Sequence, residues 1–117
     1  MRKYKDLIIW QRSVKLATEI YKVTSDFPSE EKYGLISQMR RSALSIPSNI
    51  AEGAGRSSDK EYRRFLDIAY GSAYELETQI FISFNLDFIQ KESFQVLTKE
   101  IDEIQKMIFS FSKQLKP

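Results

Sequence analysis

The chain has 117 residues, a net charge of +2 and 42% apolar residues. We expect one domain over residues 1–117, because this length and balance are typical of a single folded unit. The sequence has no cysteine and no histidine, which excludes disulfides and thiolate metal sites and removes the commonest general base. It has no run of the ~20 apolar residues that cross a membrane, and we expect no membrane partner and a cytoplasmic protein.

The first helix is predicted from about residue 7 to residue 24, where apolar residues recur in steps of three and four. Its core-facing stripe is predicted to be Leu7, Trp10, Val14, Ala17, Tyr21 and Thr24. The second helix is predicted from Ser29 to the glycines at positions 53 and 55. We expect it to continue through Pro47, because its apolar stripe stays in register across the proline. That stripe is Ile36, Met39, Ala43, Ile46 and Ile50.

The third helix is predicted to begin at a capping box, with Ser58 as the N-cap and Glu61 three residues later. Two neighbouring apolar stripes run along it, led by Phe65 and Tyr62. The fourth helix is predicted from about residue 91 to residue 115, where apolar residues keep a heptad spacing. Short connections force neighbouring helices to run antiparallel. The sequence therefore predicts an all-α, antiparallel up-down-up-down four-helix bundle, with a coiled-coil hairpin dimer as the alternative.

The residues typical of catalytic and metal sites are missing. A di-iron bundle needs inward Glu-x-x-His pairs, and the sequence has no histidine. Glu75 and Glu77 are two residues apart and point to different helix faces. Residues 53–55 lack the Lys-Ser/Thr of a phosphate-binding loop. We expect a protein that is not an enzyme and that holds no cofactor or metal.

Polar residues recur at helical spacing along the second helix, beside its apolar stripe. We expect them to hydrogen-bond to one another and to the backbone opened by Pro47, because buried polar groups need partners. An antiparallel third helix places Arg40 near residues 72–76, which makes Glu75 its predicted ion-pair partner. A structural role is predicted for Arg40, Arg41, Ser42, Ser45, Pro47, Asn49, Glu52 and Glu75.

Charge is unevenly distributed along the chain. Residues 1–24 hold six basic and two acidic residues, whereas residues 65–90 hold no basic and four acidic ones. Clustered cations can neutralise phosphates, although a solvated surface without a ligand is the alternative. The candidate nucleic-acid contacts are Lys5, Arg12, Lys15 and Lys22 along the first helix, opposite Trp10 and Val14, and Arg56, Lys60, Arg63 and Arg64 at the start of the third.

Several apolar residues lie off the predicted main stripes. A second apolar stripe on a bundle helix either widens the core or forms an interface. The residues concerned are Ile9, Leu16, Ile20, Tyr70, Tyr74, Phe81, Met107 and Phe109. Self-association is therefore an open alternative to a wider core.

The segment QMRRSALSIPSNIAEG, residues 38–53, resembles the signature of the bacterial four-helix-bundle proteins encoded in intervening sequences of 23S rRNA genes, the S23 ribosomal protein-like family. Similarity extends over nearly the whole chain, including residues 7–11, 27–35 and 65–77. The resemblance implies an up-down bundle that assembles as a ring-shaped homopentamer. It also implies kinship with the accessory protein of diversity-generating retroelements, which binds nucleic acid and reverse transcriptase.

These observations lead to one functional expectation and one alternative. We expect a non-enzymatic, oligomeric protein that binds structured RNA through its basic clusters. The alternative is a protein-interaction scaffold that docks a partner protein and has no nucleic-acid role.

Overall fold

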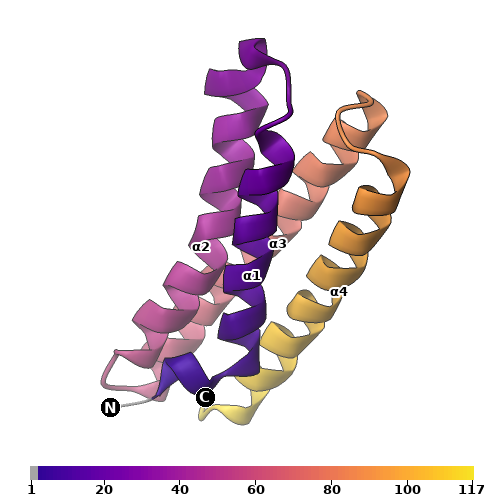
Figure 1. Cartoon of the computed structure of the whole chain (residues 1–117). Helices are drawn as coiled ribbons and strands as arrows, with labels where there is room; N and C mark the ends of the chain where they lie inside the picture. Colours follow the sequence, from indigo (N-terminus) through magenta and orange to yellow (C-terminus); the bar gives the residue numbers. More distant parts are fainter. Residues whose placement is uncertain (1–2) are drawn as a thin grey trace.

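Four helices run up and down beside one another in the computed structural model, which describes residues 3–117 (Figure 1). They are α1 (Ile8–Thr24), α2 (Ser37–Ala54), α3 (Asp59–Asn85) and α4 (Lys91–Gln114). Each helix packs against the next, and α4 returns to pack against α1. Over the described residues there is no strand. The all-α four-helix bundle is confirmed, and the four helices of one chain close the core that a hairpin would leave open.

The predicted second helix begins irregularly. Residues Ser29–Glu31 form a 3₁₀ turn and Lys32–Ile36 a wide π-helical turn, so the regular helix α2 begins only at Ser37. Gly34 has φ −113° and ψ −108°, outside the helical region. Glycine reaches such angles at little steric cost. The predicted start at Ser29 is therefore where the helical turns begin, whereas the regular α-helix begins only at Ser37.

Most of the predicted core is confirmed. The whole predicted stripe of α2 is buried, and α2 continues through a buried Pro47. The backbone N–H of Glu61 donates to the Ser58 hydroxyl at 3.2 Å, which confirms the N-cap of α3. Helix α3 draws its buried residues from both predicted stripes. They are Tyr62, Leu66, Ala69, Ala73, Leu76, Ile80 and Ser83.

The predicted stripe of α1 is confirmed only in part, because Ala17 and Thr24 are buried and Leu7 and Trp10 pack partly buried against the core, but the middle of the buried face differs. Ile9, Leu16 and Ile20 are buried, whereas Val14 and Tyr21 are 37% and 39% exposed. Both faces carry apolar residues at helical spacing, so periodicity alone did not separate them. The buried face also contains Ser13, whose hydroxyl donates to the Ile9 carbonyl at 2.6 Å and so needs no partner from another helix. The off-stripe residues of α1 therefore widen the core.

An ion pair joins α1 to α4. The Arg12 guanidinium donates to both carboxylate oxygens of Glu100, at 2.8 and 2.6 Å, and lies 3.3 Å from Glu103. The side chains of Arg12 and Glu100 are only 30% and 28% exposed. The hydrogen bonds from Arg12 lower the pKa of Glu100 below its ordinary value. Two-pronged Arg–carboxylate pairs are among the stronger polar contacts in proteins. This pair therefore fixes the position of α4 relative to α1.

Helix α2 lies very close to α3 at Gly53. A Cβ added there would lie 2.9 Å from both Phe65 Cβ and Tyr62 Cδ1, and 3.2 Å from the Tyr62 carbonyl. Gly53 lies within α2, and Gly55 follows the helix as its C-cap with φ −83°. The C-terminal stop predicted at both glycines is thus confirmed only for Gly55. Gly53 instead permits close packing of two helix backbones.

Gly53→Ala should destabilise the fold by about 1–3 kcal/mol, because the new methyl overlaps atoms of α3 that have no room to move. The midpoint of urea unfolding measures the change. Gly55→Ala is the matched control, since its nearest neighbour would lie at an ordinary 3.5 Å. The control should stay within about 0.5 kcal/mol of the natural chain. Equal losses in the two variants would contradict a packing role for Gly53.

Removing the Arg12–Glu100 pair should make stability less sensitive to acid. Because the pKa of Glu100 is lower in the folded chain, its contribution is complete at neutral pH and is lost as pH falls through its folded pKa. A double-mutant cycle of Arg12→Met and Glu100→Gln should give a coupling of about 1–2 kcal/mol at pH 7. Repeated unfolding titrations between pH 7 and pH 3 measure it. A coupling that is absent at pH 7, or that grows in acid, would contradict this account.

Candidate nucleic-acid interface

Basic residues from four segments lie at one end of the bundle. Helix α1 begins there, α2 connects to α3 there, and α4 ends there (Figure 1). The backbone N–H of Lys116 donates to Asp59 at 3.1 Å, which places the C-terminal residues beside the start of α3. We call this surface the basic end. Its cations are Lys3, Lys5, Arg56, Lys60, Arg63, Arg64, Lys113 and Lys116.

Intramolecular contacts hold some of these cations and leave others available. Arg56 lies 3.1 Å from Glu52 and stacks over Phe65. Arg64 is 3.9 Å from Glu61, with both side chains well exposed. Among residues 3–117, no ion pair involves Lys60 or Arg63. A hollow of about 230 Å³ opens here. It is lined by Lys60, Glu61, Arg63, Arg64, Asp67 and Pro117.

The basic end is only partly neutralised by its own acids. Five acidic residues belong to the same segments as its eight cations. They are Asp6, Glu52, Asp59, Glu61 and Asp67. A surplus of cations on one convex end gives a local positive potential, which attracts polyanions although the whole chain is nearly neutral.

The predicted basic row along α1 does not form one patch. Lys5 lies on the short turn Tyr4–Asp6 at the basic end. Arg12 donates to Glu100 of α4 and its side chain is only 30% exposed, so it is less available to a phosphate than the three lysines of that row. Lys22 lies in the last turn of α1, about 21 Å from the helix start at 1.5 Å per residue. The structure thus joins Lys5 to the Arg56–Arg64 cluster, and leaves Lys15 and Lys22 exposed farther along α1.

Lys3, Lys113 and Lys116 also belong to the basic end, although they were not predicted to lie there. An even number of antiparallel helices returns the chain to the end where it began. Combined with the predicted turn near residue 56, this topology brings both ends of the chain to the Arg56–Arg64 cluster. The signal was present in the predicted fold, although not in any local motif.

Arg40 does not pair with Glu75, so that prediction was wrong. Its guanidinium donates to the Thr24 hydroxyl at 2.9 Å and to the Tyr21 carbonyl at 3.2 Å, and it lies over the Tyr21 ring. The register was nearly right, because Ser45 and Ser72 meet across α2 and α3 with their hydroxyls 2.7 Å apart. Arg40, however, lies on the side of α2 that faces α1. It therefore connects α2 to α1 rather than to α3.

The rest of the polar row on α2 is mostly structural. The Asn49 amide donates to the Ser45 carbonyl at 2.7 Å and to the Ser45 hydroxyl at 2.9 Å, which confirms the predicted contacts within the row. Pro47 has no backbone N–H and so leaves the Ala43 carbonyl without its helical donor. The Asn49 amide does not bond to that carbonyl, so the predicted contact with the backbone opened by Pro47 was wrong. Arg41 is exposed. The row thus positions α2 against α3 and exposes one further cation.

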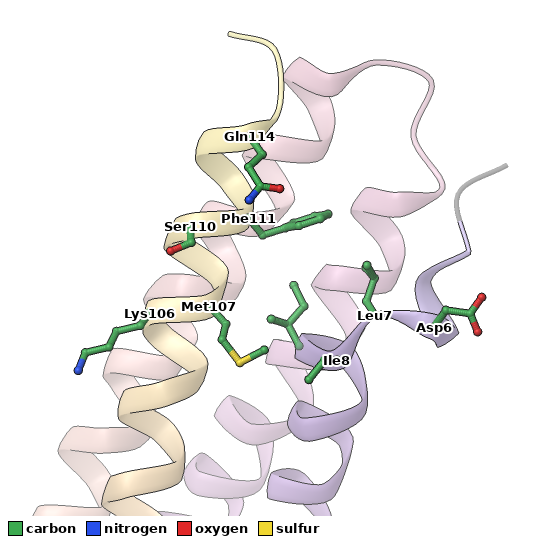
Figure 2. Close-up of a pocket in the computed structure, with 9 residues that line it drawn as sticks. Asp6, Leu7, Ile8, Lys106, Met107, Ser110, Phe111 and Gln114 are labelled. Carbon is green, nitrogen blue, oxygen red and sulfur yellow. The ribbon is translucent and has the colours of Figure 1, made fainter.

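A larger pocket lies between α1 and α4 and is mostly apolar. Its volume is about 520 Å³, and Leu7, Ile8 and Met107 are among the residues that line it. Met107 and Phe111 point into the space between the two helices, whereas Asp6 and Lys106 point away from it (Figure 2). Catalytic pockets bring a few polar groups together around a reacting atom. The lining of this pocket lacks such convergence.

No three acidic side chains within residues 3–117 lie close enough together to hold a metal ion. No helix in that part of the chain has the length and apolar character that crossing a membrane requires.

Comparison with known proteins agrees with this fold. The family model described as 23S rRNA-intervening sequence protein matches residues 5–110. A crystal structure of a protein of unknown function from the S23 ribosomal protein family of Bacteroides thetaiotaomicron is similar, with a TM-score of 0.82 and 25% identity over 91% of this chain and 99% of that chain. No curated protein matches. Neither description names a catalytic activity. The matched range covers most of the chain, which therefore belongs to the family of 23S rRNA-intervening sequence proteins.

Proposed function

We propose that this protein is a non-enzymatic, cytoplasmic homopentamer that binds structured RNA through its basic end. The observation that carries the proposal is the location of eight cations from four segments at one end of the bundle, with Lys60 and Arg63 in no ion pair among residues 3–117. Binding of this kind is electrostatic, because each bound phosphate releases counterions from the nucleic acid.

The aromatic residues of the basic end favour folded RNA over single strands. Proteins that hold single strands offer exposed aromatic rings on which bases stack. Here Tyr4 packs edge-on against Trp10, Tyr62 packs against Phe111, and Phe65 lies under Arg56. The basic end therefore offers mainly charge, which suits the phosphate backbone of a helical RNA.

Pentameric assembly would multiply the effect of one modest patch. Copies in a cyclic ring are related by rotation about one axis, so the five basic ends lie at the same height along that axis. Several weak contacts on one large RNA gain affinity through effective concentration. Assembly thus raises the affinity for RNA of a chain whose own net charge is only +2.

Arg63→Gln with Arg64→Gln should weaken binding of a labelled RNA hairpin about tenfold at 100 mM salt. It should also reduce the slope of log affinity against log salt by about one to two, since up to two phosphate contacts are lost. Fluorescence anisotropy at several salt concentrations measures both. The control is Lys91→Gln with Lys99→Gln, an equal charge change on exposed positions of α4.

The natural mass in solution should equal five chains, as measured by light scattering on a sizing column. A mass of one or two chains would contradict the pentamer. For the RNA proposal, the contradicting results are different: no binding at low salt, binding that does not respond to salt, or equal losses in the test and control variants.

A further inference from the structure

The outward face of α3 is unusually apolar for a surface. Four large side chains on it, Ile68, Tyr74, Phe81 and Ile82, are 44–47% exposed. Helical spacing places Gly71 and Thr78 on the midline of this face, with one apolar row on each side of the midline. We call this surface the α3 outer face. Its residues are Asp67, Ile68, Gly71, Tyr74, Glu75, Thr78, Phe81 and Ile82.

Nothing within residues 3–117 accounts for Gly71. A Cβ added there would have no atom within 4 Å, in contrast to the tight site at Gly53. Glycine in a helix interior is less favourable than alanine, so an exposed mid-helix glycine carries a cost without a gain in its own fold. A gap in the side-chain surface, flanked by apolar rows, is what a side chain from a second molecule would fill.

The α3 outer face is also acidic at its middle, where Glu75 lies in a stretch of α3 without basic residues, whereas Asp67 lies beside the cations of the basic end. Residues 65–90 contain no basic residue. Within the part of the chain that the structure describes, Asp67 and Glu75 take part in no ion pair. The surface would therefore repel RNA and attract a partner that is both apolar and basic.

The chain itself carries such a surface on α1. Val14 and Tyr21 form an exposed apolar row on one side of this face. Lys15 and Lys22 form a basic row on the other side, and Thr18 lies between the two rows. We call this the α1 outer face. Each of α1 and α3 packs against α2 and α4. Their outer faces consequently point away from each other and cannot meet within one chain.

We infer that the α3 outer face of one copy docks on the α1 outer face of a second copy. Two different, complementary patches on one chain produce a head-to-tail contact, which leaves one free patch of each kind on every pair of copies. Apolar rows meet apolar rows, and the lysines of α1 approach the carboxylates of α3. The inference rests on the proposed self-association, for which it supplies the contact surfaces.

Gly71→Gln tests the α3 side. The longer side chain enters open space within its own chain and has a better helix propensity, so the variant should fold and keep the helical circular-dichroism spectrum of the natural chain. It should obstruct the contact, and the mass in solution should fall to that of one chain. Ser110→Gln, at an exposed position of α4, should keep the natural mass.

Mixing two blocked variants tests the pairing of faces. Lys15→Glu with Lys22→Glu should also yield single chains, since it reverses the charge of the α1 outer face. An equimolar mixture with Gly71→Gln should form pairs and nothing larger, because one intact face of each kind remains. Contact between two α3 faces would instead let the α1-blocked chains pair without their partner.

Several results would overturn the inference. One is a natural chain that is monomeric in solution, which would assign these faces to another protein. The others are a blocked variant that keeps the natural mass and a mixture of the two variants that stays monomeric. These differ from failures of the proposed function. A natural mass other than five chains contradicts the pentamer but not the contact, and loss of RNA binding leaves both assembly tests unchanged.

Discussion

The close approach of α2 to α3 at Gly53 is the constraint on which the rest of the bundle depends. With no Cβ at this position, the two backbones meet directly, and Ser45 and Ser72 join by a hydrogen bond farther along the same pair. The opposite seam, between α1 and α4, contains the pocket of about 520 Å³ and is connected by the Arg12–Glu100 ion pair. The bundle thus has one tightly packed side and one looser side. On the looser side the Arg12–Glu100 pair adds a polar connection beside the mostly apolar pocket.

Sequence patterns predicted the fold well and the site only in part. The predicted stripe of α2 and the predicted N-cap at Ser58 were correct because the sequence around each one fits only one arrangement. Helix α1 was misread in part because it carries two apolar faces, and burial is decided by the neighbours rather than by spacing. Arg40 was assigned to the wrong neighbour for a similar reason. Spacing gives the height of a residue along a helix precisely, but a long side chain can reach either adjacent helix. The basic end required topology, since no local motif joins Lys5 to Lys116.

The surfaces of this chain separate by chemistry. The basic end carries clustered cations, and the rings near it are packed or covered. The α3 outer face carries exposed apolar side chains and unpaired acids along the length of the bundle. A polyanion and a second copy would therefore compete little for the same atoms. A small helical domain can combine assembly and binding in this way, because a bundle has both long sides and ends.

The position of the two chain ends has a practical consequence for handling the protein. Lys116 is bound to Asp59, and helix α1 begins at the same end (Figure 1). Any affinity tag or fluorescent domain joined at either end would emerge among the cations and screen them from a ligand. The turn between α3 and α4 lies at the far end, where Leu86 is exposed and Asp87 has φ 63°. An exposed turn of this kind is a suitable place to insert a reporter.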